Sequence, residues 1–167
     1  MGKIITIVGP HGVGKSALFQ YARQKDDFLV FDGFKLVTSN ESSFEDNQKR
    51  YFELIKEQNT KIINDRRDGF IIRSMEEILY FYELNNKEPA FSIPDNLFSD
   101  SIIYLDASLS ILRKRCEIDA NHDREEWYRK EYTKYDSFWK KKSNILIDTS
   151  FLNIGEVYEK IKEFVCD

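Results

Sequence analysis

Short apolar runs alternate along this chain with longer stretches in which apolar residues recur every three or four positions. The short runs predict buried strands, and the longer stretches predict amphipathic helices. Five strands are expected, at residues 4–8, 28–33, 70–72, 101–106 and 144–148. Strands that alternate with helices in this way are typical of an α/β fold, in which a parallel sheet carries helices on both of its faces.

Helical periodicity fills the intervals between these strands. Two of the expected helices begin with a capping-box pattern, in which Ser42 pairs with Glu45 and Ser74 pairs with Glu77. The sequence contains no internal repeat, linker or low-complexity segment. We therefore expect residues 1–167 to form one domain with a five-stranded parallel sheet.

The segment between the first strand and the first helix reads Gly9-Pro10-His11-Gly12-Val13-Gly14-Lys15-Ser16, which matches the phosphate-loop pattern G-x-x-x-x-G-K-[ST]. Its glycines let consecutive backbone N–H groups turn toward a polyphosphate, and the N-terminus of the helix favours the anion. We expect Lys15 to reach the β- and γ-phosphates of ATP and Ser16 to bind Mg²⁺. The other nucleotide-binding residues are expected to be Gly9, His11, Gly12, Val13, Gly14 and Ala17.

Charged residues follow the second and third strands, and ligands of a parallel α/β sheet bind at such strand ends. Asp32 can act as a general base on an acceptor hydroxyl or hold Mg²⁺ through water, but its place before a glycine equally fits a turn. Arg73 can stand near a transferring phosphoryl group or bind an acceptor anion. The alternative for Arg73 is an ion pair with Glu76 or Glu77.

An arginine-bearing lid is expected at about residues 113–126, around a stretch from about 117 to 123 in which the helical period lapses into polar residues. Arg115 and Arg124 belong to this segment. Phosphoryl transfer needs positive charge over the γ-phosphate and the exclusion of water, and a mobile lid with arginines supplies both. The alternative is a solvated helical face of mixed charge. The basic run at residues 140–142 is expected to be a solvated helix end.

Composition narrows the possible partners. The chain has 167 residues, of which 41% are hydrophobic and 32% charged, and this suits a globular protein. A net charge of −4 gives no general attraction to nucleic acid or to an anionic membrane. The two cysteines are too few for a disulfide framework, and no segment resembles a signal peptide or a membrane span, so we expect a cytoplasmic location. Some of the 14% aromatic residues could form a homodimer face.

These features together resemble the thymidylate kinase and deoxynucleoside kinase superfamily of phosphate-loop kinases over nearly the whole chain. The resemblance rests on the phosphate loop, Arg73-Ser74, residues 104–108 with Arg115 behind them, Arg124-Glu125-Glu126 and residues 145–149. It implies the fold of the P-loop nucleoside triphosphate hydrolases and a short arginine-bearing lid. It also implies a kinase that transfers the γ-phosphoryl group of ATP, with Mg²⁺, to a small nucleoside or nucleoside monophosphate.

The resemblance also implies roles for single residues at the ATP end. Phosphate-loop and lid positions of the family are matched by Lys15, Ser16, Arg115 and Arg124. Of these, the lysine and the arginines are expected to take part in catalysis. Adenine is expected near Arg115 and the loop after Asp148.

At the acceptor end, Arg73 matches the arginine of an acidic-Arg pair that follows the third strand of the family. Asp32 matches the carboxylate that serves as the base in the nucleoside kinases. The chain departs from the pattern at Ile72, where the family has an acidic residue. Two alternatives therefore stay open: a kinase of another small metabolite, and an ATP-binding regulatory module that has lost catalysis.

Overall fold

A computed structural model describes residues 1–33, 43–118 and 123–166 of the chain. Its strands are β1 (Ile4–Val8), β2 (Leu29–Phe31), β3 (Gly69–Ile71), β4 (Ser101–Asp106) and β5 (Ile145–Asp148). Its helices are α1 (Lys15–Lys25), α2 (Phe44–Asn64), α3 (Met75–Leu84), α4 (Leu109–Ile118), α5 (Asp123–Lys130), α6 (Tyr132–Lys142) and α7 (Ile154–Cys166), with a 3₁₀ turn at Asp95–Leu97.

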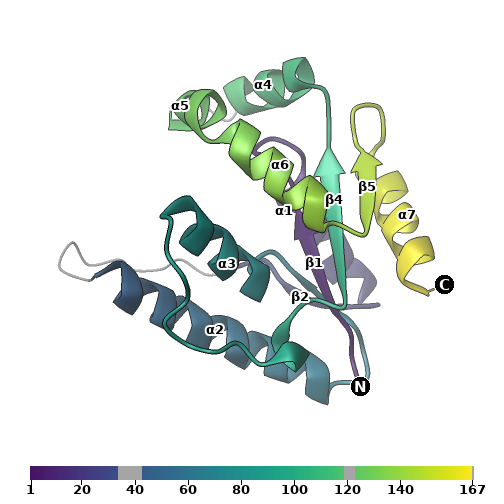
Figure 1. The fold of residues 1–167 in the computed structure, drawn as a ribbon. Coiled ribbons are helices and arrows are strands. Elements are labelled where there is room, and N and C mark those ends of the chain that lie inside the picture. The colour runs from purple at the N-terminus through teal and green to yellow at the C-terminus, as the bar shows by residue number, and fades with distance from the viewer. Residues whose placement is uncertain (34–42, 119–122, 167) are drawn as a thin grey trace. The chain divides into compact units, whose positions relative to one another are not determined.

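The strands form one five-stranded parallel sheet in the order β2-β3-β1-β4-β5 (Figure 1). Ile5 lies opposite Phe70 in the β1–β3 pair, and Tyr104 lies opposite Leu146 in the β4–β5 pair. Parallel neighbours need crossover connections, and the helices between the strands supply them. The expected α/β fold with a five-stranded parallel sheet is confirmed.

The chain divides into two compact units. Unit 1 comprises residues 1–6 and 27–100, and unit 2 comprises residues 7–26 and 101–167. Within the described ranges, no helix is both long enough and apolar enough to cross a membrane.

Unit 1 has a core in which α2 packs on β1 and β3. Ile62 of α2 contacts Ile4 and Ile71, and all three side chains are fully buried. Gly69 permits this close approach, because a Cβ atom there would lie 2.3 Å from Cδ1 of Ile62. A second apolar cluster around Ile55 joins α2 to α3.

The helix starts in unit 1 differ from the capping boxes that the sequence indicated. Ser42 lies outside the described residues, and the N-cap of α2 is Ser43, whose hydroxyl accepts a hydrogen bond of 3.1 Å from Asp46 N. Ser74 is the N-cap of α3, but its hydroxyl makes no capping hydrogen bond. The predicted pairing of Ser74 with Glu77 is therefore wrong, because the Glu77 carboxylate is engaged elsewhere in unit 1.

Unit 2 carries buried side chains on both faces of β4. Tyr104 contacts Trp139 of α6, whereas Leu105, which points to the opposite face, is buried as well. Helices α1 and α7 pack together, with the ring centroids of Tyr21 and Tyr158 5.3 Å apart. The aromatic positions 128–139 lie on two successive helices, α5 and α6. Figure 1 shows α6 running beside β4 and α7 beside β5.

Candidate active site

The phosphate loop joins β1 to α1, and its backbone has the shape that the glycines were expected to allow. Gly12 and Gly14 have φ values of 81° and 105°, which L side chains rarely adopt. A Cβ atom at Gly12 would also lie 2.8 Å from the Leu112 carbonyl oxygen. Helix α1 begins at Lys15, so the N–H groups of its first turn have no partner within the helix and are available to an anion.

The two side chains expected to bind phosphate and metal lie at the start of α1. Lys15 Nζ donates hydrogen bonds to the carbonyl oxygens of Gly9 and Pro10, the second at 3.0 Å. The Ser16 side chain, on the first turn of the helix, is exposed. The loop therefore presents an ammonium group and a hydroxyl group next to each other in sequence and at one helix end.

Phenol groups from α5 and α6 hold the backbone of the loop. Tyr135 OH donates to the Gly9 carbonyl oxygen at 3.0 Å and accepts from Gly9 N at 3.2 Å. Tyr128 OH donates to the His11 carbonyl oxygen. Burial is the main reason why the pKa of Tyr128 lies above its ordinary 10.0, so this phenol remains a donor at neutral pH. The His11 ring packs edge-on against Trp127, with centroids 4.6 Å apart.

Arg115 lies beside the segment that follows β5. Its Nη1 donates to Thr149 Oγ1 at 3.2 Å, and its Nη2 donates to the Thr149 carbonyl oxygen at 3.0 Å. The Thr149 hydroxyl is buried and lies 3.0 Å from the Asp106 carbonyl oxygen and 3.3 Å from that of Val13. Thr149 thus connects the ends of β4 and β5 to the phosphate loop, and Arg115 is anchored to this connection.

The lid expected at residues 113–126 falls partly outside the described residues, since 119–122 are not described. On either side of that gap, Arg113 and Glu125 form an ion pair at 3.5 Å that links α4 to α5. Arg124 is half-buried near Tyr128, where its charge favours the ionised phenol and so opposes the effect of burial on the Tyr128 pKa. A role of Arg124 toward phosphate stays a prediction.

Lys140 is not the solvated helix end that the basic run indicated. Its ammonium group lies 3.0 Å from Asp106 Oδ2 and 3.1 Å from Asp136 Oδ1. Burial disfavours the charged form, but the hydrogen bonds to these two carboxylates outweigh it and raise the pKa of Lys140 above 10.5. The other oxygen of Asp106 accepts from Ala107 N at 2.9 Å. The carboxylate that ends β4 is therefore neutralised by a side chain from α6.

In unit 1, Arg73 follows β3 and is paired with an acidic residue of α3. Arg73 Nη1 lies 2.6 Å from Glu77 Oε1, and the other oxygen of Glu77 accepts a hydrogen bond from Tyr51 OH. The Glu77 side chain is 13% exposed and that of Arg73 is 38% exposed. The ion pair with Glu77 was the alternative given for Arg73, and the structure contains it. Burial, followed by the Glu77 charge, raises the pKa of Tyr51, which keeps its proton.

The turn after β2 lies against this pair. Gly33 has a φ of 98°, and a Cβ atom there would lie 3.6 Å from both Cγ and Nε of Arg73. Asp32, directly before it, is exposed. A side chain at position 33 would thus touch Arg73, so the turn that follows Asp32 lies near the Arg73 side chain. The carboxylate missing at Ile72 has a counterpart in Glu77, which approaches Arg73 from the next helix.

A sequence model of the AAA domain family matches residues 5–136, which is most of the chain and includes the phosphate loop. The chain belongs to the AAA domain family. Among the curated proteins, none matches this AAA domain in sequence.

Solved structures have the same fold over their whole length. Deoxyadenosine kinase from M. mycoides with bound dATP matches with a TM-score of 0.65 and 19% identity, covering 98% of this chain and 100% of that chain. The same kinase with the products dCMP and a flexible dCDP bound matches with a TM-score of 0.64 and 20% identity, covering 97% of this chain and 98% of that chain. An uncharacterized protein from Eubacterium ventriosum ATCC 27560 matches with a TM-score of 0.62 and 14% identity, covering 99% of each chain. The AAA domain therefore has the fold of this deoxyadenosine kinase, and the fold that the resemblance implied is confirmed.

The oxygen donors of this AAA domain suit Mg²⁺. The metal prefers hydroxyl and carboxylate oxygens, and it keeps several waters and binds substrate phosphates where the protein supplies only one or two ligands. Ser16 offers an exposed hydroxyl at the start of α1 in unit 2, and Asp32 is an exposed carboxylate at the end of β2 in unit 1. Among the described residues, no group of three or more His, Cys, Asp or Glu side chains could hold a metal by itself. The Ser16 hydroxyl beside the phosphate loop thus fits a cation carried in by the nucleotide.

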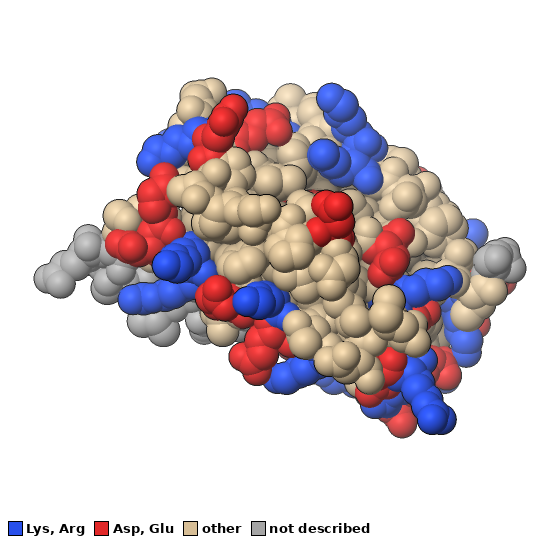
Figure 2. Space-filling model, turned by 60° about the horizontal axis from the view of Figure 1, so that its bottom comes forward, with Lys and Arg blue, Asp and Glu red and all other residues tan. Residues whose placement is uncertain are grey.

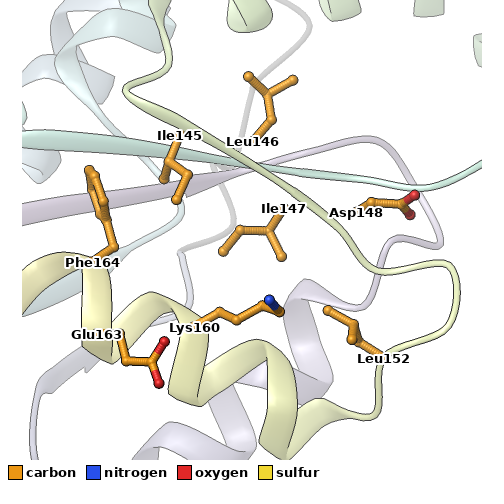
Figure 3. A pocket seen from close by; sticks show the side chains of 8 residues that line it. All are labelled: Ile145, Leu146, Ile147, Asp148, Leu152, Lys160, Glu163 and Phe164. Atoms are coloured by element: carbon orange, nitrogen blue, oxygen red, sulfur yellow. The ribbon is translucent and has the colours of Figure 1, made fainter.

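A cavity of ≈ 500 Å³ opens in unit 2 between the edge strand β5 and α7 (Figure 3). Ile147 points toward Lys160 of α7, and Leu146 points to the other side of the strand. Of the expected site residues that the structure describes, none lines this cavity. Neither the phosphate loop nor Arg115 contributes to the lining of this cavity. Asp148, at the end of β5, does contribute.

The surface of the AAA domain carries both signs of charge. Figure 2 shows acidic and basic side chains around the edge of one face, a group of basic side chains at its upper right, and uncharged residues over much of its middle.

Sequence reasoning gave no role to the residues that hold the phosphate loop and Arg115 in place. These residues are Tyr128, Tyr135 and Thr149. The two tyrosines follow the expected lid at helical spacing, and that position is the signal that could have drawn attention to them. The sequence suggested Glu77 as a capping partner of Ser74 and as an alternative ion-pair partner of Arg73, but not as part of the site.

Proposed function

We propose that this AAA domain is a kinase that transfers the γ-phosphoryl group of ATP to a hydroxyl group of a small nucleoside. The phosphate loop carries this proposal, because it has glycines with positive φ, Lys15 at its end and a helix N-terminus behind it. Support also comes from the fold, which is that of a deoxyadenosine kinase over the full length of both chains.

We assign the donor nucleotide to unit 2. Lys15 and the loop amides bind the phosphates of ATP, and Ser16 would hold Mg²⁺, which would supply positive charge against the negative charge of the phosphates. Arg115 and Arg124 add positive charge as the phosphoryl group departs. The anchoring of Arg115 on Thr149 supports this assignment, because a guanidinium with two fixed hydrogen bonds loses little further freedom on binding.

We assign the acceptor to unit 1, and the state of Arg73 favours a hydroxyl over a phosphate. An acceptor phosphate would need an arginine whose charge is available to it. The charge of Arg73 is already balanced by Glu77 at 2.6 Å, so its attraction for a second anion is reduced. A nucleoside hydroxyl, which is neutral, does not need that charge. Phosphorylation of a nucleoside monophosphate, as in a thymidylate kinase, is the alternative.

A hydroxyl acceptor needs a base, and we assign that role to Asp32. The side chain is exposed at the end of β2, and the turn at Gly33 that follows lies near Arg73. A base within reach of the attacking hydroxyl contributes roughly 10²–10⁴-fold to such reactions. If the acceptor group is a phosphate, little base is needed, and the loss of the carboxylate has a much smaller effect.

The test is acceptor-dependent ADP formation with ATP and Mg²⁺, measured across nucleosides, nucleoside monophosphates and small hydroxylated metabolites. Lys15→Ala provides the blank. We expect turnover with a nucleoside, none in the blank, and a loss of at least about 100-fold in kcat for Asp32→Asn while ATP still binds. Turnover that requires a nucleoside monophosphate and tolerates Asp32→Asn would establish the alternative acceptor instead.

Two further hypotheses are separated by the same assay. A kinase of another small metabolite would be active only with one of the small hydroxylated metabolites. An ATP-binding regulatory module would bind ATP without turnover in the wild-type chain, and Ile72, in place of the acidic residue of the family, is the observation that favours it. A homodimer, the absence of a nucleic-acid partner and a cytoplasmic location stay predictions from composition.

A further inference from the structure

The carbonyl group of Gly9 has two side-chain donors. One is the ammonium group of Lys15, and the other is the hydroxyl group of Tyr135, at 3.0 Å. Gly9 is buried, and a Cβ atom there would lie 2.4 Å from the Leu105 carbonyl oxygen, so the surroundings of this peptide group are closely packed. In such surroundings the Gly9 carbonyl depends on these donors.

Binding of a triphosphate changes what is available to this carbonyl. To reach the β- and γ-phosphates, Lys15 has to leave the carbonyl groups of Gly9 and Pro10. The Pro10 carbonyl keeps a backbone donor, Val13 N, at 3.4 Å. The Gly9 carbonyl keeps the hydroxyl group of Tyr135.

We propose that Tyr135 is a positioning residue for nucleotide binding: its hydroxyl keeps the Gly9 carbonyl hydrogen-bonded when Lys15 turns to the phosphates of ATP. The same oxygen accepts from Gly9 N, so one phenol holds both polar groups of this residue and the orientation of the loop at its first glycine. The proposal rests on the proposed function in that ATP is the ligand. It adds α6 to the elements that determine ATP affinity.

The first experiment measures the Kd of ATP with Mg²⁺ by calorimetry for the wild type, Tyr135→Phe and Tyr132→Phe. Phenylalanine keeps the ring of Tyr135, which lies 5.3 Å from that of Trp127, and removes only the hydroxyl. Tyr132 is on the same helix, and its hydroxyl interacts with Asp136 instead of the loop. We expect Tyr135→Phe to raise the Kd about tenfold, equivalent to about 1.4 kcal/mol, because a buried acceptor is left unpaired in the complex.

Tyr132→Phe is expected to change the Kd less than twofold. In the kinase assay, Tyr135→Phe should raise KM for ATP and leave kcat at saturating ATP within about twofold, as expected for lost ground-state binding. Equal Kd values for Tyr135→Phe and wild type, or an equal rise in both tyrosine variants, would overturn the proposal.

The second experiment needs neither nucleotide nor turnover, so it separates failure of this inference from failure of the proposed kinase activity. Urea midpoints are measured for wild type, Tyr135→Phe, Lys15→Met and the double variant. Each single variant leaves one donor on the Gly9 carbonyl, whereas the double variant leaves neither. We expect the midpoint of the double variant to fall by clearly more than the sum of the single shifts. Additive shifts would show that the two side chains do not share this carbonyl.

Discussion

Replacement of Glu77 by Gln tests whether this carboxylate sets the preference of the AAA domain for a neutral acceptor over one that carries a phosphate. The carboxylate accepts hydrogen bonds from Arg73 and from the hydroxyl of Tyr51, one on each oxygen. Glutamine has nearly the same shape, but it carries no charge, and only one of its two terminal atoms can accept. In Glu77→Gln, either Arg73 or Tyr51 therefore faces an NH₂ group, and the guanidinium loses its counter-charge.

The structure allows the size of two effects to be estimated, the loss of stability and the change in acceptor preference. A hydrogen bond to a charged group contributes about 1.5–3 kcal/mol, but Arg73 is more than a third exposed, so we expect a loss of unfolding free energy of about 1–2 kcal/mol. For a chain of this length that corresponds to a decrease in Tm of roughly 2–8 °C. The uncompensated guanidinium should also favour an acceptor that carries a phosphate, by about 1.4 kcal/mol, or tenfold in kcat/KM.

The assay compares kcat/KM for a nucleoside and for the corresponding nucleoside monophosphate in wild type and variant. We expect the ratio of monophosphate to nucleoside to rise about tenfold in Glu77→Gln, because the charge of Arg73 is then available to an anion. Glu83→Gln removes an exposed carboxylate from the same helix and should leave the ratio unchanged. A ratio that stays constant or falls in Glu77→Gln, with the protein folded, would refute the argument that Glu77 sets the preference for a neutral acceptor.

Three more predictions concern the phosphate loop, the Arg115 anchor and the start of α2. Gly12→Ala should destabilise the chain by about 1–3 kcal/mol more than Gly14→Ala in urea unfolding, because both have positive φ but only Gly12 would also clash with backbone; equal losses would contradict this reasoning. Thr149→Val should raise KM for ATP by about fivefold through the loss of a hydrogen bond to Arg115, and Thr149→Ser should restore it; a serine variant as weak as the valine variant would argue against the hydroxyl. The pKa of Glu45 is lowered below 4.5, chiefly by a hydrogen bond from a tyrosine of α3, so its contribution to stability is present above pH 4.5 and is lost as the pH falls through the lowered value. Unfolding measured from pH 3 to 7 should therefore show the stability difference between wild type and Glu45→Gln shrinking below pH 4.5, and a constant difference would contradict the assignment.

Local patterns in the sequence were sufficient to predict the strands of the sheet and the phosphate loop. The apolar runs at residues 4–8 and 101–106 are β1 and β4 with the same bounds, and the other three strands differ from expectation by one or two residues at an end. The phosphate loop was equally readable, because its glycines, Lys15 and the start of α1 are neighbours in the chain. Such features depend on residue spacing and on the backbone preferences of single residues, and both can be read from the sequence without the tertiary structure.

The helix starts show where local patterns fail. A capping box needs only four residues, yet Ser74 and Glu77 do not form one. Glu77 has better partners in Arg73 and in Tyr51, which is 26 positions away in the chain. A charged partner outcompetes a neutral backbone amide, since hydrogen bonds to charged groups are roughly twice as strong.

The side chains that complete the candidate site could not be predicted from the sequence, because they are far in the chain from the groups that they contact. Tyr135 is separated from Gly9 by 126 positions, and Lys140 lies 34 positions beyond Asp106. Periodicity predicts that Tyr135 faces the interior, but it does not say which polar group the hydroxyl meets there.

The sequence by itself thus determined the order of elements, the parallel sheet and the loop that binds phosphate, because each follows from the spacing of neighbouring residues. Only the tertiary structure decided which side chains hold that loop, which carboxylate balances Arg73 and which lysine neutralises Asp106. These pairings depend on the position and rotation of whole helices, which are set by packing throughout a unit and not by any local pattern.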